Sequence, residues 1–277
     1  MKKRILAVFL AVAALACSLS ACGGATTQTP TPSDETTPSS GAVHANELTV
    51  GIAQDLDDSL DPYQMTAAGT REVMFNVFEG LVKPDSDGNY VCAVASDYQV
   101  SEDGLTYTFT LRDGVVFHNG ATCTPDDVLY SFETCAATSV TSAVVTALSA
   151  VTDTVVDGNQ ITMTLSAPNS DFLSYVASVY IVPADYADQA TKPVGTGPFK
   201  YISRSVQENI ILEKHAEYYG EPAHLDKVTY KIYEDGTALF TALDSGSLDL
   251  VAHLTMDQVN NLSNGYKVLE GTMNLVQ

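Results

Sequence analysis

Residues 96–132 constrain the fold of this 277-residue chain more than any other part, because strand, turn and helix signals follow one another there without a gap. Over residues 105–111, apolar side chains alternate with threonines, and this period of two indicates a half-buried strand. Residues 112–114 (Arg-Asp-Gly) and 118–120 (His-Asn-Gly) are turn sequences, because Gly and Asn tolerate positive φ. Residues 124–127 (Thr-Pro-Asp-Asp) supply an N-cap, a proline at N1 and two acids for a first helical turn. The stretch predicts a β-ribbon followed by a capped helix, and it contains no catalytic pattern.

This stretch resembles the family 5 solute-binding proteins of ABC importers, the group that includes oligopeptide, dipeptide and nickel binders. The similarity lies in the turn at 101–104, in Thr-Tyr-Thr-Phe-Thr-Leu-Arg-Asp-Gly at 106–114, in Phe-His-Asn-Gly at 117–120 and in the helix start at 124–132. Four further motifs follow the family's order: Ser-Leu-Asp-Pro at 59–62, Asn-Val-Phe-Glu-Gly-Leu-Val at 76–82, Pro-Val-Gly-Thr-Gly-Pro-Phe at 193–199 and Ser-Gly-Ser-Leu-Asp-Leu at 245–250. The resemblance therefore extends over about residues 48–268.

Three positions depart from the family pattern. Tyr98 and Tyr219 stand where tryptophans are usual, and Asn119 stands where an Asp is usual. Tyr fills much of the same apolar volume as Trp, so these changes do not threaten the fold.

The resemblance implies an α/β fold of the type II periplasmic-binding-protein kind, in which two lobes close on a solute. It assigns residues 47–85 and 195–270 to the core subdomain of lobe I, and 86–194 to a smaller, β-rich inserted subdomain. Residues 271–277 correspond to the crossover to lobe II, which the sequence lacks. We therefore expect a fragment of a longer gene, or a truncated product that cannot clamp a solute.

Periodicity predicts the elements around these motifs. Apolar residues at helical spacing predict a helix over 70–81, and two alternating runs predict a hairpin from 151–156 and 160–165. We also expect a strand to end at 180–183 and a last strand over 266–270.

The charge balance excludes several classes of partner. The chain has 34 Asp and Glu against 13 Lys and Arg, a formal net charge of −21. Nucleic-acid binding and docking on anionic lipid headgroups both need basic patches, so neither is expected. The preferred interpretation is a solvated extracellular surface, and the sharper alternative is attraction of cationic solutes.

The first 21 residues have the organisation of a lipoprotein signal peptide. Lys2-Lys3-Arg4 forms a basic n-region, and the apolar run at 5–16 is too short for an ordinary membrane span. Leu-Ser-Ala-Cys at 19–22 resembles a lipobox, so cleavage before Cys22 and lipidation of that cysteine are expected. The alternative is an ordinary secretory leader with an incidental cysteine. Residues 22–46, rich in Thr, Pro and Ser, then form a disordered tether.

The remaining cysteines and the histidines do not form recognisable metal motifs. Cys92, Cys123 and Cys135 lack CxxC spacing, and we expect free, packed thiols, with one disulfide among the three as the alternative. The five histidines are scattered without paired spacing, so neither a structural metal nor another cofactor is expected. No G-x-S-x-G elbow occurs and no carboxylate pair is singled out, so an enzyme is not expected.

Candidate ligand-contacting residues follow from the resemblance, which points to two loop segments of lobe I. They are Tyr63, Gln64, Met65, Thr66, Val179 and Tyr180. Tyr and Met offer an apolar body with a polar or soft tip, which suits a pocket wall, but local packing is an equally good interpretation.

The function that the resemblance implies is capture of a solute, preferably a peptide, and its delivery to ABC permease subunits. The protein is expected to be a monomer outside the cytoplasm, anchored to the outer face of the cell membrane through Cys22. The alternatives are an anchored surface sensor or interaction protein on the same fold, or a non-functional fragment.

Overall fold

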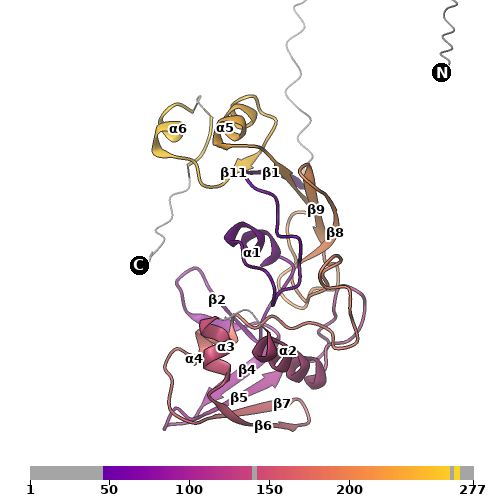
Figure 1. Ribbon diagram of the computed structural model, residues 1–277. Coiled ribbons are helices and arrows are strands. Elements are labelled where there is room, and N and C mark those ends of the chain that lie inside the picture. Colours follow the sequence, from indigo (N-terminus) through magenta and orange to yellow (C-terminus); the bar gives the residue numbers. More distant parts are fainter. Residues whose placement is uncertain (1–45, 139–141, 263–264, 269–277) are drawn as a thin grey trace, which may run out of the picture. The chain divides into compact units, whose positions relative to one another are not determined.

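The computed structural model describes residues 46–138, 142–262 and 265–268 of the chain. The signal peptide, Cys22, almost all of the tether and residues 271–277 lie outside the described residues. In the described residues, the strands form two larger sheets and a short two-stranded ribbon, and helices accompany them (Figure 1).

The larger sheet has five strands in the order β11-β1-β10-β9-β8. Its first strand, β1 (Glu47–Ile52), runs parallel to β10 (Lys227–Ile232) on one side and to β11 (Leu250–Val251) on the other. The strands β9 (Asn209–Lys214) and β8 (Phe199–Ser205) complete it with antiparallel pairings. The chain thus returns to pair with its first strand after more than 170 residues.

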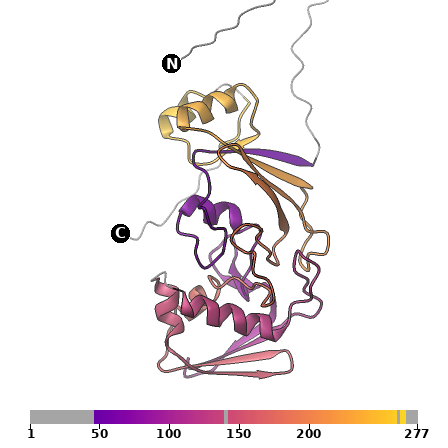
Figure 2. The same cartoon turned by 45° about the vertical axis from the view of Figure 1, so that its right-hand side comes forward.

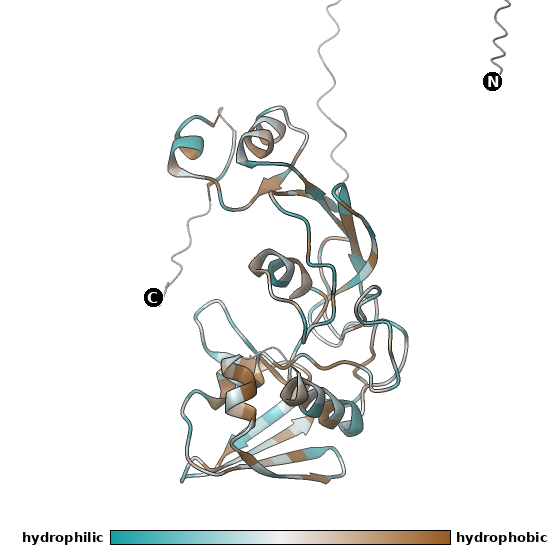
Figure 3. Cartoon of the chain, in the orientation of Figure 1, coloured by the Kyte–Doolittle hydropathy of each residue, from teal (hydrophilic) through white to brown (hydrophobic). Residues whose placement is uncertain are grey.

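The second sheet has four antiparallel strands in the order β4-β5-β7-β6, so that β5 pairs with β7 rather than with β6. Its strands are β4 (Ala95–Val100), β5 (Thr106–Leu111), β6 (Val151–Asp157) and β7 (Gln160–Leu165). Along β5 the predicted alternation is confirmed, since Tyr107, Phe109 and Leu111 are buried and the threonines are half-exposed. The predicted hairpin is β6–β7, and Figure 3 shows hydrophobic and hydrophilic residues alternating along it.

Three helices accompany this second sheet: α2 (Pro125–Ala137), α3 (Ala143–Leu148) and α4 (Phe172–Val176). Figure 2 shows α2 running along one face of the sheet. The predicted start of α2 is confirmed as a capping box, in which the Asp127 carboxylate accepts hydrogen bonds from the backbone N–H and hydroxyl of Thr124 at 2.8 and 2.7 Å. Val128 and Phe132 of α2 are buried in the core.

The shorter elements are α1 (Ala68–Met74), the ribbon β2 (Val82–Pro84) with β3 (Tyr90–Cys92), α5 (Gly236–Asp244) and α6 (Met256–Asn260). The longest described helix, α2, has 13 residues, and none of the helices in the described ranges is both long and apolar enough to cross a bilayer. Whether 47–85 with 195–270 and 86–194 are separate subdomains stays a prediction.

The prediction of a helix over 70–81 was wrong at its C-terminal end. Helix α1 ends at Met74, and the chain continues as a turn and an irregular segment. The carbonyl oxygens of Asn76 and Val77 accept hydrogen bonds from the backbone N–H groups of Phe199 (3.0 Å) and Gly197 (2.9 Å). Those acceptors are thereby committed to a distant segment instead of the next helical turn, so tertiary contacts override local helix propensity.

Two expected strands are not formed. Residues 180–183 are irregular, although the Ile181 N–H donates to the Glu79 carbonyl oxygen at 2.9 Å. Residues 266–268 are not in a strand, and 269–270 lie outside the described part. The expected free thiols are confirmed: Cys92 is half-buried, Cys123 and Cys135 are buried, and none of the three is in a disulfide.

Candidate functional site

The two loop segments that the sequence singles out are joined by one hydrogen bond. The Tyr63 hydroxyl donates to the carbonyl oxygen of Tyr180 at 2.6 Å. Burial of the Tyr63 ring raises the pKa of its hydroxyl well above the ordinary value, so it stays protonated and remains a donor. Tyr180 in turn stacks on Phe78, with ring centroids 5.6 Å apart.

The six candidate side chains divide into a buried and an accessible set. Tyr63, Met65 and Val179 are 9%, 3% and 0% exposed, so they pack into the core behind the loop surface. Gln64 and Thr66 are exposed, and Tyr180 is half-buried. Local packing is therefore the better interpretation for the first three, whereas the other three are the ones that reach solvent.

A short loop before these residues is held in place by its own carboxylate. Asp57 accepts hydrogen bonds from the backbone N–H groups of Thr66 (2.8 Å) and Ala67 (2.9 Å), immediately before α1 begins. Burial alone would raise the pKa of Asp57, but these hydrogen bonds hold it below its ordinary value. The loop conformation thus depends on an ionised Asp57.

An arginine of β8 fixes the other end of that loop. The Arg204 guanidinium donates to the Asp55 carboxylate at 2.9 Å and to the carbonyl oxygens of Leu56 and Asp57, each at 2.7 Å. Both side chains of the ion pair are nearly buried, at 11% and 5% exposure. The loop between β1 and α1 is therefore anchored to the larger sheet rather than free.

Residues 76–82 form a backbone hub, which we call the seam. Besides its bonds to Gly197 and Phe199, the seam accepts hydrogen bonds at the Gly80 and Leu81 carbonyl oxygens from the N–H groups of Val94, Ala93 and Ala95. Its Glu79 side chain is only 6% exposed. The seam therefore connects segments that lie far apart in the sequence.

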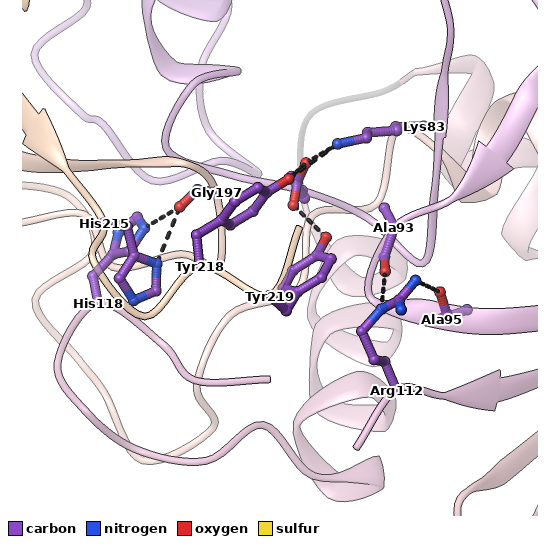
Figure 4. Close-up of polar contacts among 10 residues, drawn as sticks. Lys83, Ala93, Ala95, Arg112, His118, Gly197, His215, Tyr218 and Tyr219 are labelled. Atoms are coloured by element: carbon purple, nitrogen blue, oxygen red, sulfur yellow. Dashed lines mark hydrogen bonds and ion pairs between the residues drawn. The ribbon is translucent and has the colours of Figure 1, made fainter. Parts of the chain in front are cut away.

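A polar network surrounds the Glu79 carboxylate, and Figure 4 labels its members Lys83, Tyr218 and Tyr219. Lys83 Nζ lies 2.6 Å from Glu79 Oε1, the Tyr218 hydroxyl donates to the same oxygen at 2.8 Å, and the Tyr219 hydroxyl donates to the other oxygen. Burial alone would lower the pKa of Lys83, but the Glu79 carboxylate raises it above its ordinary value. Three donors satisfy a buried charge, which is the condition for tolerating it in a core.

Two histidines that lie far apart in the sequence meet beside the seam (Figure 4). The rings of His118 and His215 lie 4.8 Å apart, edge to face, and Nε2 of His118 and Nδ1 of His215 lie 2.9 and 3.2 Å from the Gly197 carbonyl oxygen. His118 Nδ1 accepts from the Gly195 N–H, so its Nε2 carries the proton. Burial lowers the pKa of His118 to about 3 and lowers that of His215.

The pair clamps the loop of residues 195–197, because a ring nitrogen of each histidine lies within hydrogen-bond distance of the Gly197 carbonyl oxygen. Within the described ranges, no group of three or more His, Cys, Asp or Glu side chains is arranged to hold a metal ion. Sequence spacing carries no signal for the pair, because its members meet only through the fold of residues 195–197.

A cavity of about 910 Å³ opens beside the larger sheet, and none of the six predicted residues lines it. Its walls come from β1, α1, β10, α5 and the segment after β11. Its apolar lining includes Leu48, Val50, Ile52, Val73, Phe75, Phe199, Leu225, Val228, Leu239, Leu250 and Leu254. The alternation of Leu48, Val50 and Ile52 along β1 indicates one apolar face of the strand, but it does not indicate an open hollow.

Comparison with known proteins decides the family. A sequence profile of the bacterial extracellular solute-binding proteins, family 5 Middle, matches residues 89–275. The chain belongs to this family. Its members are binding proteins, so family membership agrees with the sequence-based expectation that the chain is not an enzyme.

Curated relatives of this family 5 chain carry several ligand names. It is 27% identical over 232 residues to the glutathione-binding protein GsiB of Pectobacterium atrosepticum, covering 76% of this chain and 43% of the relative. It is 26% identical over 245 residues to the dipeptide-binding protein of Lactococcus lactis, covering 76% and 44%. The family 5 chain thus spans less than half the length of these relatives.

Solved structures confirm the fold. DppA of Helicobacter pylori in complex with the peptide STSA superposes with a TM-score of 0.71 at 28% identity, covering 77% of this chain and 48% of DppA. The agropinic-acid complex of AgaA from A. tumefaciens gives 0.69 at 30% identity, covering 74% and 43%. The predicted α/β fold of the type II periplasmic-binding-protein kind is therefore confirmed, and the described residues are consistent with a single lobe.

Proposed function

We propose that this chain forms a solute-binding lobe for an ABC importer and that the solute is a peptide. The observation that carries the proposal is the family match over residues 89–275, supported by similarity to a peptide-bound DppA and to a dipeptide-binding protein. Other relatives are named for glutathione, haem and nickel, so the peptide assignment is the part to be tested.

Within the proposed function, the accessible candidates carry the contacts. Gln64 and Thr66 present a side-chain amide and a hydroxyl from a loop that hydrogen bonds to Asp57 hold in place. The half-buried Tyr180 is joined to this loop by the hydrogen bond that Tyr63 donates to its carbonyl oxygen. Rigid loops bearing a few polar groups are the usual way in which a binding protein orients a solute. Tyr63, Met65 and Val179 act behind them by holding the loop in place.

The proposed location is the outer face of the cell membrane, through a lipid on Cys22. The lipobox-like Leu-Ser-Ala-Cys and the following polar tether support it. Metabolic labelling with a palmitate analogue should tag the wild-type chain but not Cys22→Ser. Equal labelling of both would contradict the anchor.

A thermal-shift screen of the chain from residue 23 onward tests the solute class. Di- and oligopeptides, glutathione, nickel–histidine chelates and sugars are compared at equal concentration. A ligand present at 100 times its Kd stabilises the native state by about 2.7 kcal/mol, which is readily detected as a rise in Tm. Peptides should raise Tm, and the rise should shrink in Thr66→Val and Gln64→Ala but not in Gln99→Ala, an exposed amide on β4. A Tm rise with nickel chelates alone would overturn the peptide assignment.

A further inference from the structure

Strand β6 forms an open edge of the second sheet. It pairs with β7 on one side, and no strand in the described part of the chain pairs with its other side (Figure 1). Every second residue of such an antiparallel edge strand directs its backbone N–H and C=O groups away from the sheet. The only shift in the β6–β7 register lies between Val151 and Asp153, so residues 153–157 form a regular edge. Lysine and proline, which commonly protect edge strands from further pairing, are absent from β6.

Burial of the apolar face of this sheet stops before it reaches the edge. On β7, Ile161, Met163 and Leu165 are 0%, 1% and 3% exposed. On β6, Val156 pairs with Ile161 and therefore lies on the same face, but it is 37% exposed. Val155 on the opposite face is 52% exposed. Apolar side chains exposed on both faces of an edge strand would be covered by a further strand beside it.

The charged side chains on this part of the chain are acidic. Residues 113–191, which include β6 and β7, contain aspartates and glutamates but no lysine or arginine. Asp153 and Asp157 of β6 are exposed, and neither belongs to an ion pair in the described residues. Side chains alternate across a strand, so Asp153, Val155 and Asp157 share one face. The edge therefore presents acidic, apolar and acidic side chains at successive positions of that face.

We propose that β6 is a docking edge for a basic, extended segment of a partner protein, which adds to the sheet as an antiparallel fifth strand. Backbone groups of β6 pair with the segment, and Lys or Arg side chains of the partner lie opposite Asp153 and Asp157. An apolar partner side chain lies opposite Val155, so the segment carries the pattern basic-x-apolar-x-basic. None of the six predicted solute-contacting residues lies on β6, so this contact is distinct from solute binding.

Charge favours a basic partner over a second copy of this chain. Antiparallel pairing of two β6 strands would bring the aspartates of both copies to one junction, and β6 offers no basic side chain to balance them. Like charges close together weaken strand pairing, whereas a basic segment is attracted by the same aspartates. The formal net charge of −21 adds a longer-range repulsion between two copies.

Two peptides of opposite charge test the chemistry of the partner. Dye-labelled Lys-Val-Val-Thr-Lys and Glu-Val-Val-Thr-Glu, with both termini capped, are titrated with the chain from residue 23 onward, and fluorescence anisotropy gives the Kd of each. The basic peptide should bind at least about ten-fold more tightly, and added salt should reduce the difference. Equal affinities, or binding of neither peptide, would overturn the docking edge.

Substitutions on the two edges of the sheet locate the contact. Asp153→Asn should weaken binding of the basic peptide about two- to five-fold, and Val155→Lys, which places a positive charge between the aspartates, about ten-fold or more. Asp97→Asn removes the same charge from β4, the opposite edge strand, and should leave the affinity unchanged. All three positions are exposed, so the variants should fold, which circular dichroism verifies. An affinity that Asp153→Asn and Val155→Lys leave unchanged would place the peptide elsewhere, for example in the solute site, and would overturn the docking edge alone.

N-methylation of the basic peptide tests for backbone pairing. Only alternate N–H groups of an added strand face β6. Methylation of the second and of the third backbone nitrogen in Lys-Val-Val-Thr-Lys should therefore differ in effect, so that one weakens binding about ten-fold and the other does not. Equal effects of the two methylations would show that the segment does not add as a strand. A dimer in sedimentation velocity that Val155→Lys dissociates would show that a second copy occupies the edge instead.

Discussion

The two larger sheets differ in how completely the apolar side chains beside them are buried. In the β4–β7 sheet, one face is closed, with Phe109, Ile161 and Met163 at most 1% exposed, and the other face presents threonines on β5 and β7. In the sheet that contains β1, an apolar wall borders a cavity, and Phe75 and Leu250 remain accessible. The closed β4–β7 sheet therefore buries the apolar face of β5 and β7, whereas large apolar side chains beside the open sheet of β1 stay exposed in the described residues. Predicted effects of substitution differ accordingly.

The largest effect is expected in the closed sheet. Phe109→Ala removes a fully buried ring and should lower the free energy of unfolding by about 3–5 kcal/mol. Phe75→Ala is the matched change beside the open sheet and should alter it by no more than about 0.5 kcal/mol, because that ring is 59% exposed. Urea denaturation monitored by circular dichroism measures both. Similar losses in the two variants would erase the distinction between the sheets.

The next effect concerns the seam between them. A Cβ at Gly195 would lie 2.3 Å from the Val77 carbonyl oxygen and 2.7 Å from the Phe78 ring, so Gly195→Ala should cost about 2–3 kcal/mol. A Cβ at Gly69 in α1 would meet no atom within 4 Å outside its own helix backbone and chain neighbours, and Gly69→Ala should stabilise by about 0.5–1 kcal/mol through helix propensity. The Tm values of the two variants should shift in opposite directions. An unchanged Tm in Gly195→Ala would show that the seam backbone moves to accommodate the added methyl group.

The histidine clamp on the seam predicts a dependence on pH. Burial lowers the pKa of His118 to about 3 from 6.5, so the unfolded chain binds a proton below pH 6.5 that the folded protein does not. Stability should therefore fall with decreasing pH, by up to about 1.4 kcal/mol per unit, until about pH 3. Between pH 6.5 and about 4.5, carboxylates with a lowered pKa, such as Asp57, add a slope of the same sign toward the acidic end. The difference between wild type and a His118 variant therefore carries the test.

Substitution of His118 tests the origin of that slope. His118→Gln should flatten the dependence of unfolding free energy on pH in this window, while His224→Gln, at an exposed position, should not. Denaturant titrations at four pH values between 4.5 and 6.5 give the slopes. Parallel slopes in wild type and His118→Gln would refute the clamp as their source.

The smallest effect is expected at the partly exposed end of the Glu79 network. Lys83 is 41% exposed, and Glu79 keeps its two tyrosine donors without it, so Lys83→Gln should cost about 1 kcal/mol or less. Tyr219→Phe leaves one buried carboxylate oxygen without its donor and should cost more, by about 1–3 kcal/mol. A reversed order would mean that the lysine, not the tyrosines, satisfies the buried charge.

Features that depend on neighbouring residues could be predicted from the sequence. The alternation in β5, the capping box of α2 and the β6–β7 hairpin arise from contacts within a few residues, and all three predictions are confirmed. The C-terminal end of α1 could not be predicted, because acceptors at residues 76 and 77 are used by residues 197 and 199. Hydrogen bonds between residues so far apart produce no periodic pattern in the sequence, so they cannot be predicted from it.

The candidate site shows the same division. The family resemblance pointed to two loops, which the Tyr63–Tyr180 hydrogen bond joins, but it could not tell that Met65 and Val179 are buried in the core. His118 and His215 are 97 positions apart in the sequence, and the cavity takes its lining from residues 48–76 and 199–258. Neither has a local motif, so only the fold reveals them. The ligand-contacting roles of the six residues stay a prediction.

The parallel pairing of β1 with β10 has a kinetic consequence. Asn46 and Asp226, at the start of this pairing, hydrogen-bond across 180 positions of sequence. A chain made or exported from its N-terminus therefore carries β1 as an unpaired strand until β10 emerges, while the hairpin of β6 and β7 can already form. Large contact order slows closure of the larger sheet. The β4–β7 sheet is thus expected to fold first. Once it is folded, the effective loop between the two distant strands β1 and β10 is shorter, which favours their pairing.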